Sequence, residues 1–530
     1  MLHTVQSFRG MVTASHHLAA RAGLRVLEDG GNAIEAMIAA ASTIAVVYPH
    51  MNALGGDNFW LIHTPGGEVT GIDACGAAAG RADIAFYKKQ GFDAIPSRGP
   101  LAALTVAGAV SGWEEAYRFS KEKWGGRLPL SRILEDATFL ARDGFAVTRT
   151  QAANTSGKLE ELKNVPGFAS TFLPEGQPPA VGYRFRQPAL AETLKVLAEK
   201  GLDTFYRGDL ARAIAAELEA AGSPITLADL ESHRALRLKP LTVEVAGHRI
   251  FNMPPPTQGL ASLILLGVFD RLGVKEAEGF DFVHGLVEST KRAFRIRDRY
   301  VTDPHYMKAD PKSFLTSEKL DALAAEISMK TALPWPEAAA PGDTVWLGAA
   351  DSEGRVVSFI QSIYWEFGSG VALPETGITW QNRGVSFSLD PSHHNCLKPH
   401  RRPFHTIQPA LGHLNDGRVM AYGTMGGEGQ PQTQAMVFAR HVLFGQELQQ
   451  AVSAPRWLLG RTWGASATNL RIENRFAADV LAALKNAGHD VDVISDFDEV
   501  MGHAGAVVFH PDGLIEGAAD PRGNGLPAGF

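Results

Sequence analysis

Residues 332–362 of this 530-residue chain read ALPWPEAAAPGDTVWLGAADSEGRVVSFIQS, and this stretch decides the fold. Its first part, Ala332 to Gly342, is rich in proline and alanine, a composition typical of a mobile linker. Two apolar segments follow, Thr344–Ala350 and Arg355–Ser362, and the residues between them, Asp351–Gly354, are turn formers. This pattern predicts a β-hairpin directly after the linker.

The predicted register of this hairpin places two hydroxyl groups side by side. Pairing Ala350 with Arg355 across the four-residue turn brings Thr344 opposite Gln361. Ser362 then lies next to Thr344, because cross-strand neighbours are about 5 Å apart. Taken alone, the pattern is compatible with an ordinary edge hairpin as well as with a nucleophile at the head of a strand.

The composition is that of a globular protein, with 45% hydrophobic, 20% charged and 8% aromatic residues. The net charge of −7 gives no indication of a nucleic-acid partner. The two cysteines, Cys75 and Cys396, lie far apart in the sequence and form no disulfide framework. We therefore expect a large packed core to stabilise the fold.

The N-terminal residues MLHTVQSFRG have neither the basic nor the apolar region of a signal peptide, which favours a cytoplasmic location. The most apolar stretch, Ala33 to Val47, contains Glu35 and is shorter than the roughly 20 residues that span a bilayer. The sequence therefore predicts no membrane partner.

Two consecutive helices are expected near the N-terminus. The first ends at Gly30-Gly31, and Asn32 followed by Glu35 has the spacing of a capping box for the second. The loop YPHMNALGGD then leads into the strand-like segment FWLIH. Further helices are predicted at residues 129–144, 188–201, 209–222 and 280–300, and a strand at residues 241–253.

Motifs along nearly the whole chain match one known family. They are GMVTASHHLAARAGLRVLEDGGNAIEAMIAAASTIAVVYPHMNALGGDNFWLIH (10–63), VAGAVSGWEEAY (106–117), GRLPLSRILEDATFLARDGFAV (126–147), FYRGDLARAIAAEL (205–218), ITLADLESH (225–233), NMPPPTQG (252–259), RRPFHTIQPA (401–410) and GTMGGEGQPQTQ (423–434). The sequence thereby resembles the γ-glutamyltranspeptidase family, whose members are N-terminal nucleophile (Ntn) hydrolases.

The resemblance implies an α/β fold with four αββα layers and an inactive precursor that cuts its own backbone. The cut would fall between Asp343 and Thr344. It would produce a large subunit, residues 1–343, that ends in the mobile linker at 332–343. The small subunit, residues 344–530, would carry the nucleophile. The two fragments would stay partners within one structural domain.

The resemblance also implies the chemistry. The Thr344 hydroxyl attacks the preceding carbonyl, and hydrolysis of the resulting ester frees an α-amine. Such an amine has an unperturbed pKa of about 7.7–8, so near neutral pH it can act as the base for the same hydroxyl. Gly426 and Gly427 match the glycines of the family's oxyanion hole, where one donor contributes about 3 kcal/mol. Ser362 occupies the place of a second threonine that is hydrogen-bonded to the nucleophile.

The substrate clamp departs from the family pattern. The arginine that holds a glutamyl α-carboxylate aligns with Asp73. The asparagine, glutamine and aspartate that hold the α-amine align with Tyr364, Arg383 and Ser386. The paired serines that bind carboxylate become His405 and Thr406. Every glutamyl contact that the alignment places is therefore altered.

Arg383 stands where the family has a residue that binds the ammonium group of the substrate. A cation at this position favours a substrate whose acyl part carries a carboxylate and no α-amine. Among relatives, this pattern resembles the oxamate amidohydrolases of bacterial purine breakdown, which release ammonia. Glutaryl or cephalosporin acylases, glutathione hydrolases or γ-glutamyltransferases, and a catalytically silent scaffold are the alternatives. Arg383 paired with a structural acid such as Glu366 is the competing interpretation of that residue.

No cofactor and no metal are expected. The cluster formed by His393, His394, Cys396, His400 and His405 lacks the spacing of a zinc site. The segment GGEGQPQT lacks the ending of a phosphate-binding loop. The predicted partner is a small-molecule substrate, and the sequence is compatible with homo-oligomers.

Overall fold

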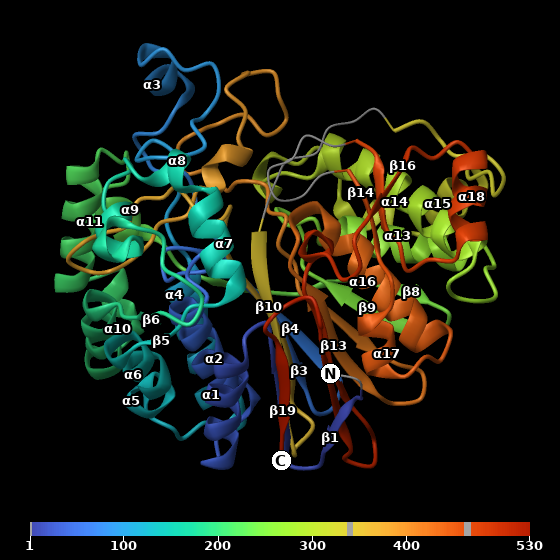
Figure 1. Ribbon diagram of the computed structural model, residues 1–530, viewed down its shortest axis with the longest axis horizontal. Coiled ribbons are helices and arrows are strands. Elements are labelled where there is room, and N and C mark those ends of the chain that lie inside the picture. Colours follow the sequence, from blue (N-terminus) through green and yellow to red (C-terminus); the bar gives the residue numbers. More distant parts are fainter. Residues whose placement is uncertain (1–2, 336–342, 461–467) are drawn as a thin grey trace.

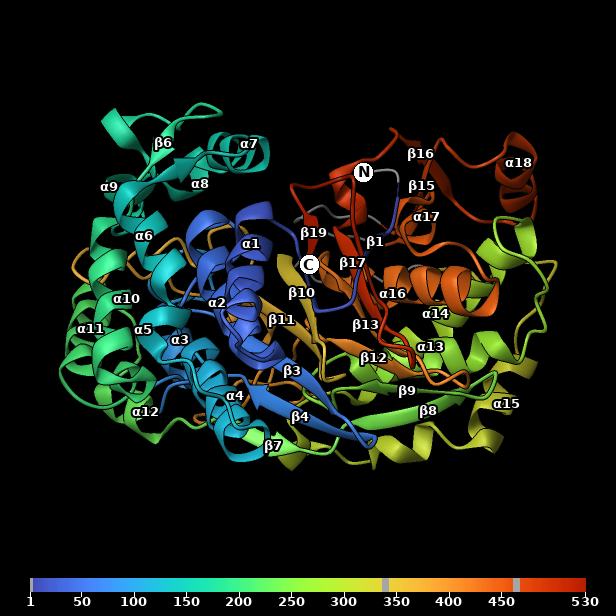
Figure 2. The same ribbon diagram turned by 90° about the horizontal axis from the view of Figure 1, so that it is seen from below.

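Two stacked β-sheets of seven strands each form the centre of the structure, and helices cover both outer faces (Figure 1 and Figure 2). This computed structural model describes residues 3–335, 343–460 and 468–530. The order helix, sheet, sheet, helix confirms the predicted α/β fold with four αββα layers. Among the described residues, no helix combines the length and the apolar character that crossing a membrane requires.

The first sheet contains the predicted hairpin and has the strand order β19-β2-β10-β11-β3-β4-β7, with antiparallel neighbours throughout. The hairpin strands β10 and β11 therefore lie between β2 and β3 from the N-terminal part of the chain. The strands are β2 (Gly10–Ala14), β3 (Asp57–Thr64), β4 (Glu68–Ala74), β7 (Leu236–Leu238), β10 (Asp343–Asp351), β11 (Val356–Tyr364) and β19 (Leu526–Gly529).

The second sheet is also antiparallel, in the order β1-β18-β17-β13-β12-β9-β8. Its strands are β1 (Val5–Ser7), β8 (Leu241–Val245), β9 (His248–Asn252), β12 (Ala410–His413), β13 (Val419–Thr424), β17 (Ala504–Phe509) and β18 (Ile515–Ala519). Two small sheets lie at the periphery, formed by β5 (Phe145–Ala146) with β6 (Arg184–Phe185), and by β14 (Trp457–Leu459), β15 (Leu470–Glu473) and β16 (Val491–Ile494).

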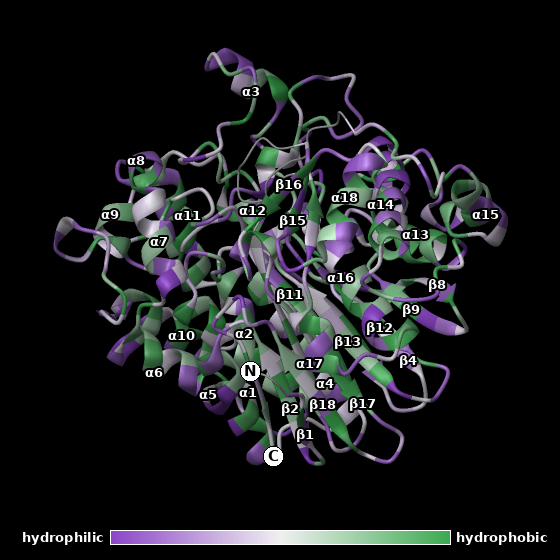
Figure 3. Cartoon of the chain, turned by 45° about the vertical axis from the view of Figure 1, so that its right-hand side comes forward, coloured by the Kyte–Doolittle hydropathy of each residue, from purple (hydrophilic) through white to green (hydrophobic). Residues whose placement is uncertain are grey.

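Trp346 of β10 fills the space between the two sheets. Its indole N–H donates to Ser358 Oγ at 3.0 Å, which satisfies the one polar group of a buried ring. A Cβ atom at Gly423 would lie 2.1 Å from the indole, so only glycine allows this close approach. Figure 3 shows how hydropathy is distributed over the whole fold. Hydrophobic residues are concentrated on the sheets and the helices beside them, and hydrophilic residues in the outer loops.

The turn of the hairpin differs from the predicted one. Ala350 pairs with Val356 rather than with Arg355, and the Asp351 N–H donates to the carbonyl oxygen of Arg355 at 3.2 Å. Gly354 has φ +78°, the left-handed conformation of a three-residue loop that ends in a bulge. The register is therefore shifted by one residue.

A β-bulge at the head of β10 restores the predicted neighbourhood. Val345 pairs with Gln361, where the sequence had placed Thr344. The register then shifts so that Thr344 alone faces Ser362 and Ile363. The expected proximity of Thr344 and Ser362 is thus confirmed, although the predicted pairing is wrong.

The outer face of the first sheet is covered by α1 (His17–Glu28), α2 (Ala33–Val47) and α4 (Ala109–Trp124). The predicted capping box of α2 is confirmed: the Asn32 side chain accepts from the N–H of Glu35, and the Glu35 carboxylate accepts from the N–H of Asn32. Further helices on this side are α3 (Ile84–Lys89), α5 (Leu130–Ile133), α6 (Glu135–Asp143), α7 (Arg149–Gly157), α8 (Leu159–Leu162), α9 (Phe168–Phe172), α10 (Pro188–Lys200), α11 (Asp209–Ala221) and α12 (Leu227–Ser232).

On the other side, α13 and α16 pack on the second sheet and α14 packs on α13. The helices of this layer are α13 (Gly259–Asp270), α14 (Phe280–Tyr300), α15 (Ser317–Ala325), α16 (Gln430–Phe438), α17 (Leu448–Ser453) and α18 (Ala478–Asn486). The predicted helices at 188–201, 209–222 and 280–300 are confirmed as α10, α11 and α14.

Two other predicted elements differ from the structure. Residues 129–144 form α5 and α6 rather than one helix, because the backbone leaves the helical region at Leu134. Residues 241–253 form the hairpin of β8 and β9, because Ala246 and Gly247 both take positive φ angles and reverse the chain. Both cysteines are free and buried. Most of the predicted linker, residues 336–342, lies outside the described residues.

The cap of α2 supports the helix that lies on β10 and β11. We expect Asn32→Ala to destabilise the protein by about 1–2 kcal/mol, because the side chain caps the helix and also donates to Ser120 Oγ. The midpoint of thermal unfolding measures this effect. Asp83→Ala is the control, since Asp83 caps only the short exposed helix α3. Equal midpoints for the two variants would contradict the prediction.

Candidate active site

Three strands bring polar residues into one row of the first sheet. Ser362 on β11 pairs with Asp57 on β3, and the bulge on the other side of β11 sets Thr344 across from Ser362. Neighbouring strands lie about 4.8 Å apart, so Thr344 and Asp57 are separated by about 10 Å. Ser362 of β11 lies between them in this row.

Thr344 lies at the head of β10 and is fully buried. The side-chain amide of Gln430 donates to Thr344 Oγ1 at 3.3 Å. The amide oxygen of Gln430 accepts from the N–H of Gln408 at 3.2 Å, which holds the amide in this orientation. The hydroxyl of Thr344 is thus positioned from the first turn of α16.

Tyr364 has a strained backbone that directs its ring over an arginine. Its φ angle is +81°, which is unfavourable for an aromatic residue. The N–H of Tyr364 donates to Ser362 Oγ at 2.8 Å and so helps to hold this conformation. The guanidinium carbon of Arg383 lies 3.8 Å from the centre of the tyrosine ring.

Arg383 is a fully buried cation with unused donors. Nη1 donates to Thr406 Oγ1 at 3.2 Å, whereas Nε and Nη2 have no hydrogen-bond partner in the described part of the chain. Burial lowers its pKa to about 10, against the opposing effects of Tyr364 and Asp57. Glu366, the structural acid considered above, lies 3.9 Å from Arg98 instead.

His405 adjoins this cation. Its imidazole packs edge-on against Phe59 at 5.1 Å, and Nε2 lies 3.5 Å from Asp57 Oδ2. Neither ring nitrogen has a hydrogen-bond partner among the residues that the structure describes. Burial, followed by the charges of Arg383 and Arg402, lowers the pKa of His405 well below its usual range. The ring is therefore neutral.

Asp57 completes the polar lining. Its Oδ1 accepts from the backbone N–H groups of Gly76 and Gly108 at 3.0 and 2.9 Å. Burial raises the pKa of the carboxyl group to about 7, although these hydrogen bonds and Arg383 oppose the shift. Oδ2 has no hydrogen-bond partner within the described residues, although His405 lies nearby.

One glutamine connects the glycine turn that precedes α16 to the segment that contains His405 and Thr406. Gly426 has φ +115°, a conformation that favours glycine. The amide of Gln258 donates to the carbonyl oxygen of Gly427 at 2.8 Å and to that of Thr406 at 2.5 Å. Arg297 in turn donates to Gln258 Oε1 at 3.0 Å. One network therefore positions the turn and the clamp together.

Two residues of the predicted clamp make other contacts. Ser386 donates to the carbonyl oxygen of Phe404 at 3.1 Å. Asp73 forms an ion pair with Arg402 at 2.7 Å, so its charge is neutralised. The structure thus brings Thr344 and Ser362 into one sheet row, and stacks Tyr364, Arg383, Thr406 and His405 beside it.

The sequence matches the family described as gamma-glutamyltranspeptidase over residues 19–530. The chain belongs to the γ-glutamyltranspeptidase family. Its four-layer sandwich is the Ntn-hydrolase fold, and the protein is a hydrolase that acts on carbon–nitrogen bonds.

Relatives that match nearly the whole chain carry the names of several different enzymes. A protein of Klebsiella pneumoniae subsp. pneumoniae named oxamate amidohydrolase proenzyme is 56% identical over 524 residues, with 99% of each chain covered. A glutathione hydrolase-like proenzyme of Bacillus subtilis is 40% identical, with 100% of both chains covered. The solved structure of cephalosporin acylase from Bacillus halodurans superposes with a TM-score of 0.91 at 35% identity, covering 100% of this chain and 97% of the other.

Sequence reasoning about this family member missed three of the residues that build the site. Gln258 and Gln430 stand inside the motifs NMPPPTQG and GTMGGEGQPQTQ, and Asp57 ends the loop YPHMNALGGD. The motifs marked the right segments. Their side-chain roles depend on contacts between segments far apart in the sequence, which no local pattern reports.

One group of described side chains has the chemistry of a metal site. Ligand atoms of His284, Glu288 and His489 all lie within 4.8 Å of one another. However, the two imidazoles pair with each other at 2.8 Å, and Lys291 Nζ lies 2.7 Å from the Glu288 carboxylate. The group is therefore a buried ion pair beside a histidine pair. The absence of a metal in this family member stays a prediction.

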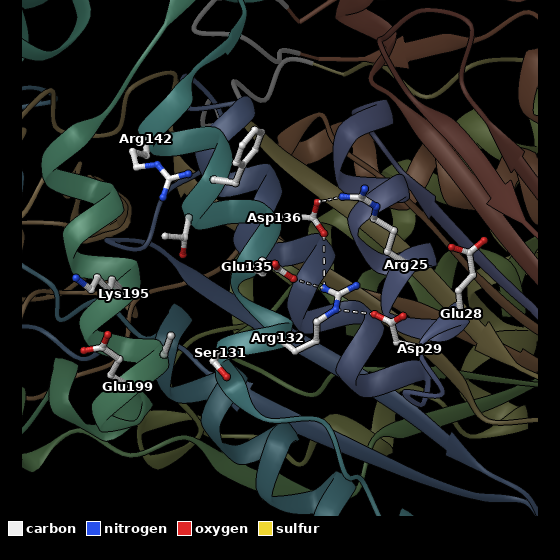
Figure 4. Close-up of a pocket in the computed structure, with 13 residues that line it drawn as sticks. Arg25, Glu28, Asp29, Ser131, Arg132, Glu135, Asp136, Arg142, Lys195 and Glu199 are labelled. Atoms are coloured by element: carbon white, nitrogen blue, oxygen red, sulfur yellow. Dashed lines mark hydrogen bonds and ion pairs between the residues drawn. The ribbon is translucent and has the colours of Figure 1, made fainter.

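A pocket of about 770 Å³ between α1, α6 and α10 contains none of the candidate site residues (Figure 4). Arg25 pairs with Asp136, and Arg132 pairs with Asp29, each at 2.6 Å. Two arginines of this pocket are therefore paired with neighbouring acids. Its labelled lining residues are Arg25, Glu28, Asp29, Ser131, Arg132, Glu135, Asp136, Arg142, Lys195 and Glu199.

Gln258, which donates to the carbonyl oxygens of Gly427 and Thr406, gives a testable prediction. Gln258→Leu removes both hydrogen bonds to backbone carbonyls and leaves Arg297 without one acceptor. Losses of about 1–3 kcal/mol for unsatisfied buried groups, if they fall on the transition state, correspond to a decrease in kcat of roughly five- to 150-fold. Steady-state kinetics of the cleaved protein measures it.

Gln187→Leu is the matched control, because this buried amide donates to the carbonyl of Val46 at 2.9 Å, outside the candidate site. An equal loss of kcat in both variants would show a general effect of removing a buried glutamine.

Proposed function

We propose that this chain is an autoprocessed amidohydrolase that cleaves the amide of a small carboxylate-bearing substrate of the oxamate type. The supporting observation is the buried guanidinium of Arg383, which keeps two donors without partners close to the row that contains Thr344. A guanidinium with free parallel donors is suited to a carboxylate. The 56% identical relative named oxamate amidohydrolase proenzyme supports the same substrate class.

In the proposed maturation, the Thr344 hydroxyl attacks the carbonyl of Asp343 and water then hydrolyses the ester. The products are residues 1–343 and residues 344–530. They remain joined by the first sheet, since β10 pairs with β2 and β11 pairs with β3. The precursor thus becomes a two-chain enzyme without taking its sheet apart.

In the proposed catalytic cycle, Thr344 Oγ1 attacks the amide carbonyl and its proton passes to the new α-amine. The carbon–nitrogen bond breaks, ammonia leaves with that proton, and an ester to Thr344 remains. Gly426 and Gly427 N–H groups stabilise the oxyanion, while Ser362 positions the nucleophile. Water then releases the acid.

The proposed pocket suits a short acid. Arg383 and Thr406 bind the carboxylate, and His405 and Tyr364 form the walls. Ser386 supports the segment before His405 through its hydrogen bond to the carbonyl oxygen of Phe404. A glutamyl group would add three carbons and an ammonium, for which no acceptor stands at Arg383. The alternative activities are glutathione hydrolysis or γ-glutamyl transfer, and hydrolysis by a glutaryl or cephalosporin-type acylase. Both can be tested on the same protein.

Thr344→Ala tests the proposed cleavage. The variant should remain one chain of 530 residues on denaturing electrophoresis and lose all amidase activity. The wild-type protein should give two fragments, and Edman sequencing of the smaller one should begin TVWLG. A mature, active protein with an uncut chain would refute the proposed mechanism.

A substrate panel on the processed protein tests specificity. Oxamate should be turned over better than γ-glutamyl-p-nitroanilide or a glutaryl amide. Arg383→Met should lower kcat/KM for oxamate by about thirtyfold or more, because losing a buried charged contact costs at least about 2 kcal/mol.

The matched control is Arg401→Met, since Arg401 is also buried and lies 4.2 Å from the ring centre of Tyr306. This control should leave KM for oxamate unchanged. Equal or better turnover of the glutamyl compound by the wild type would contradict the proposed substrate class.

A further inference from the structure

Asp57 lies in the same sheet row as Thr344 and Ser362, and its Oδ2 has no hydrogen-bond partner among the described residues. Its Oδ1 is held by Gly76 and Gly108, so the carboxyl group cannot rotate freely. Oδ2 points to the side where His405 lies at 3.5 Å. Oδ2, both nitrogens of His405 and two nitrogens of Arg383 all lack hydrogen-bond partners among described residues. These five buried polar atoms are free to form hydrogen bonds to a bound molecule.

We propose that Asp57 is a specificity-determining residue that admits an anionic substrate only as the neutral acid. In that state Oδ2 carries a proton and donates to the bound anion, beside the cation Arg383. When Asp57 ionises, its carboxylate repels the substrate and neutralises Arg383 in its place. Substrate binding is therefore coupled to one proton. This inference rests on the proposed function for the identity of the anion.

The groups that face Asp57 do not change their charge near neutral pH. Burial raises the pKa values of Cys75 and Tyr206 above their usual ranges, so both stay neutral. Burial lowers the pKa of His405 well below its usual range, and Arg383, with a pKa of about 10, stays charged. Asp57, with a pKa of about 7, is the one member of this group that titrates between pH 6 and 9.

The neighbouring charges beyond this group are already paired. Arg402 and Asp73 form an ion pair at 2.7 Å. In mature protein, the α-amine of Thr344 also titrates, with an unperturbed pKa of about 7.7–8. Its loss of a proton raises kcat with pH, whereas ionisation of Asp57 raises KM. The two effects separate in steady-state kinetics.

The experiment measures KM and kcat for oxamate between pH 6 and 9. For wild-type protein, KM should rise about tenfold for each pH unit above the pKa of Asp57, as expected for one linked proton. Asp57→Asn places an amide N–H where the acid proton was and keeps an oxygen for Gly76 and Gly108. This variant should have a KM that is nearly independent of pH.

The matched control is Asp351→Asn at the opposite end of β10. Asp351 is also a buried acid with a raised pKa, held by backbone N–H groups, and it lies outside the site. It should retain the alkaline rise in KM. The same rise in Asp57→Asn, or a flat KM in the wild type, would overturn the proposal.

Binding of oxalate measured by calorimetry in buffers of different ionisation enthalpy gives a second readout that needs no turnover. Near pH 8 the wild type should take up about one proton on binding, and Asp57→Asn should take up none. Oxalate binding with proton uptake but no oxamate turnover would reject the proposed function and support the role of Asp57. Binding without proton uptake would reject that role alone.

Discussion

A positive charge buried without a charged partner is the constraint on which the candidate site depends. Removing an ion from water costs several kcal/mol, and proteins usually offset this cost with a counter-ion. Within the described chain, Arg383 has only one hydroxyl acceptor and the face of a tyrosine ring. The neighbouring acid, Asp57, carries a proton up to about pH 7. The buried charge of Arg383 is thus left without a counter-ion below about pH 7, and the proposed anionic substrate would supply one.

The backbone accepts strain to maintain this arrangement. A positive φ angle at Tyr364 costs of the order of 1–3 kcal/mol, and it persists because its surroundings determine it. The Ser362 hydroxyl accepts from its N–H, and Tyr364 pairs with Asp343 of β10. The same hydroxyl therefore lies beside the proposed nucleophile and supports the residue that covers the cation.

The four layers were predictable from the resemblance to the family, the capping box of α2 from the spacing of Asn32 and Glu35, and the neighbourhood of Thr344 and Ser362 from the hairpin pattern. The register of the hairpin was not, because it depends on the positive φ of Gly354, and the letters DSEG fit more than one turn. The reversal at Ala246 was missed for the same reason, since alanine rarely adopts such angles. Asp57 could not be found because its raised pKa arises from burial among distant segments.

In the first sheet, β10 and β11 lie between β2 and β3, and this arrangement affects how the protein can refold after the proposed cleavage. Folding of the intact precursor is a first-order process, because a single chain supplies all four strands. Once the proposed cut after Asp343 is made, the same sheet would belong to two polypeptides, and reassembly after denaturation would become a second-order reaction that dilution slows. The mature protein would then persist through a slow rate of unfolding rather than through reversible equilibrium, so that each molecule has effectively one opportunity to fold.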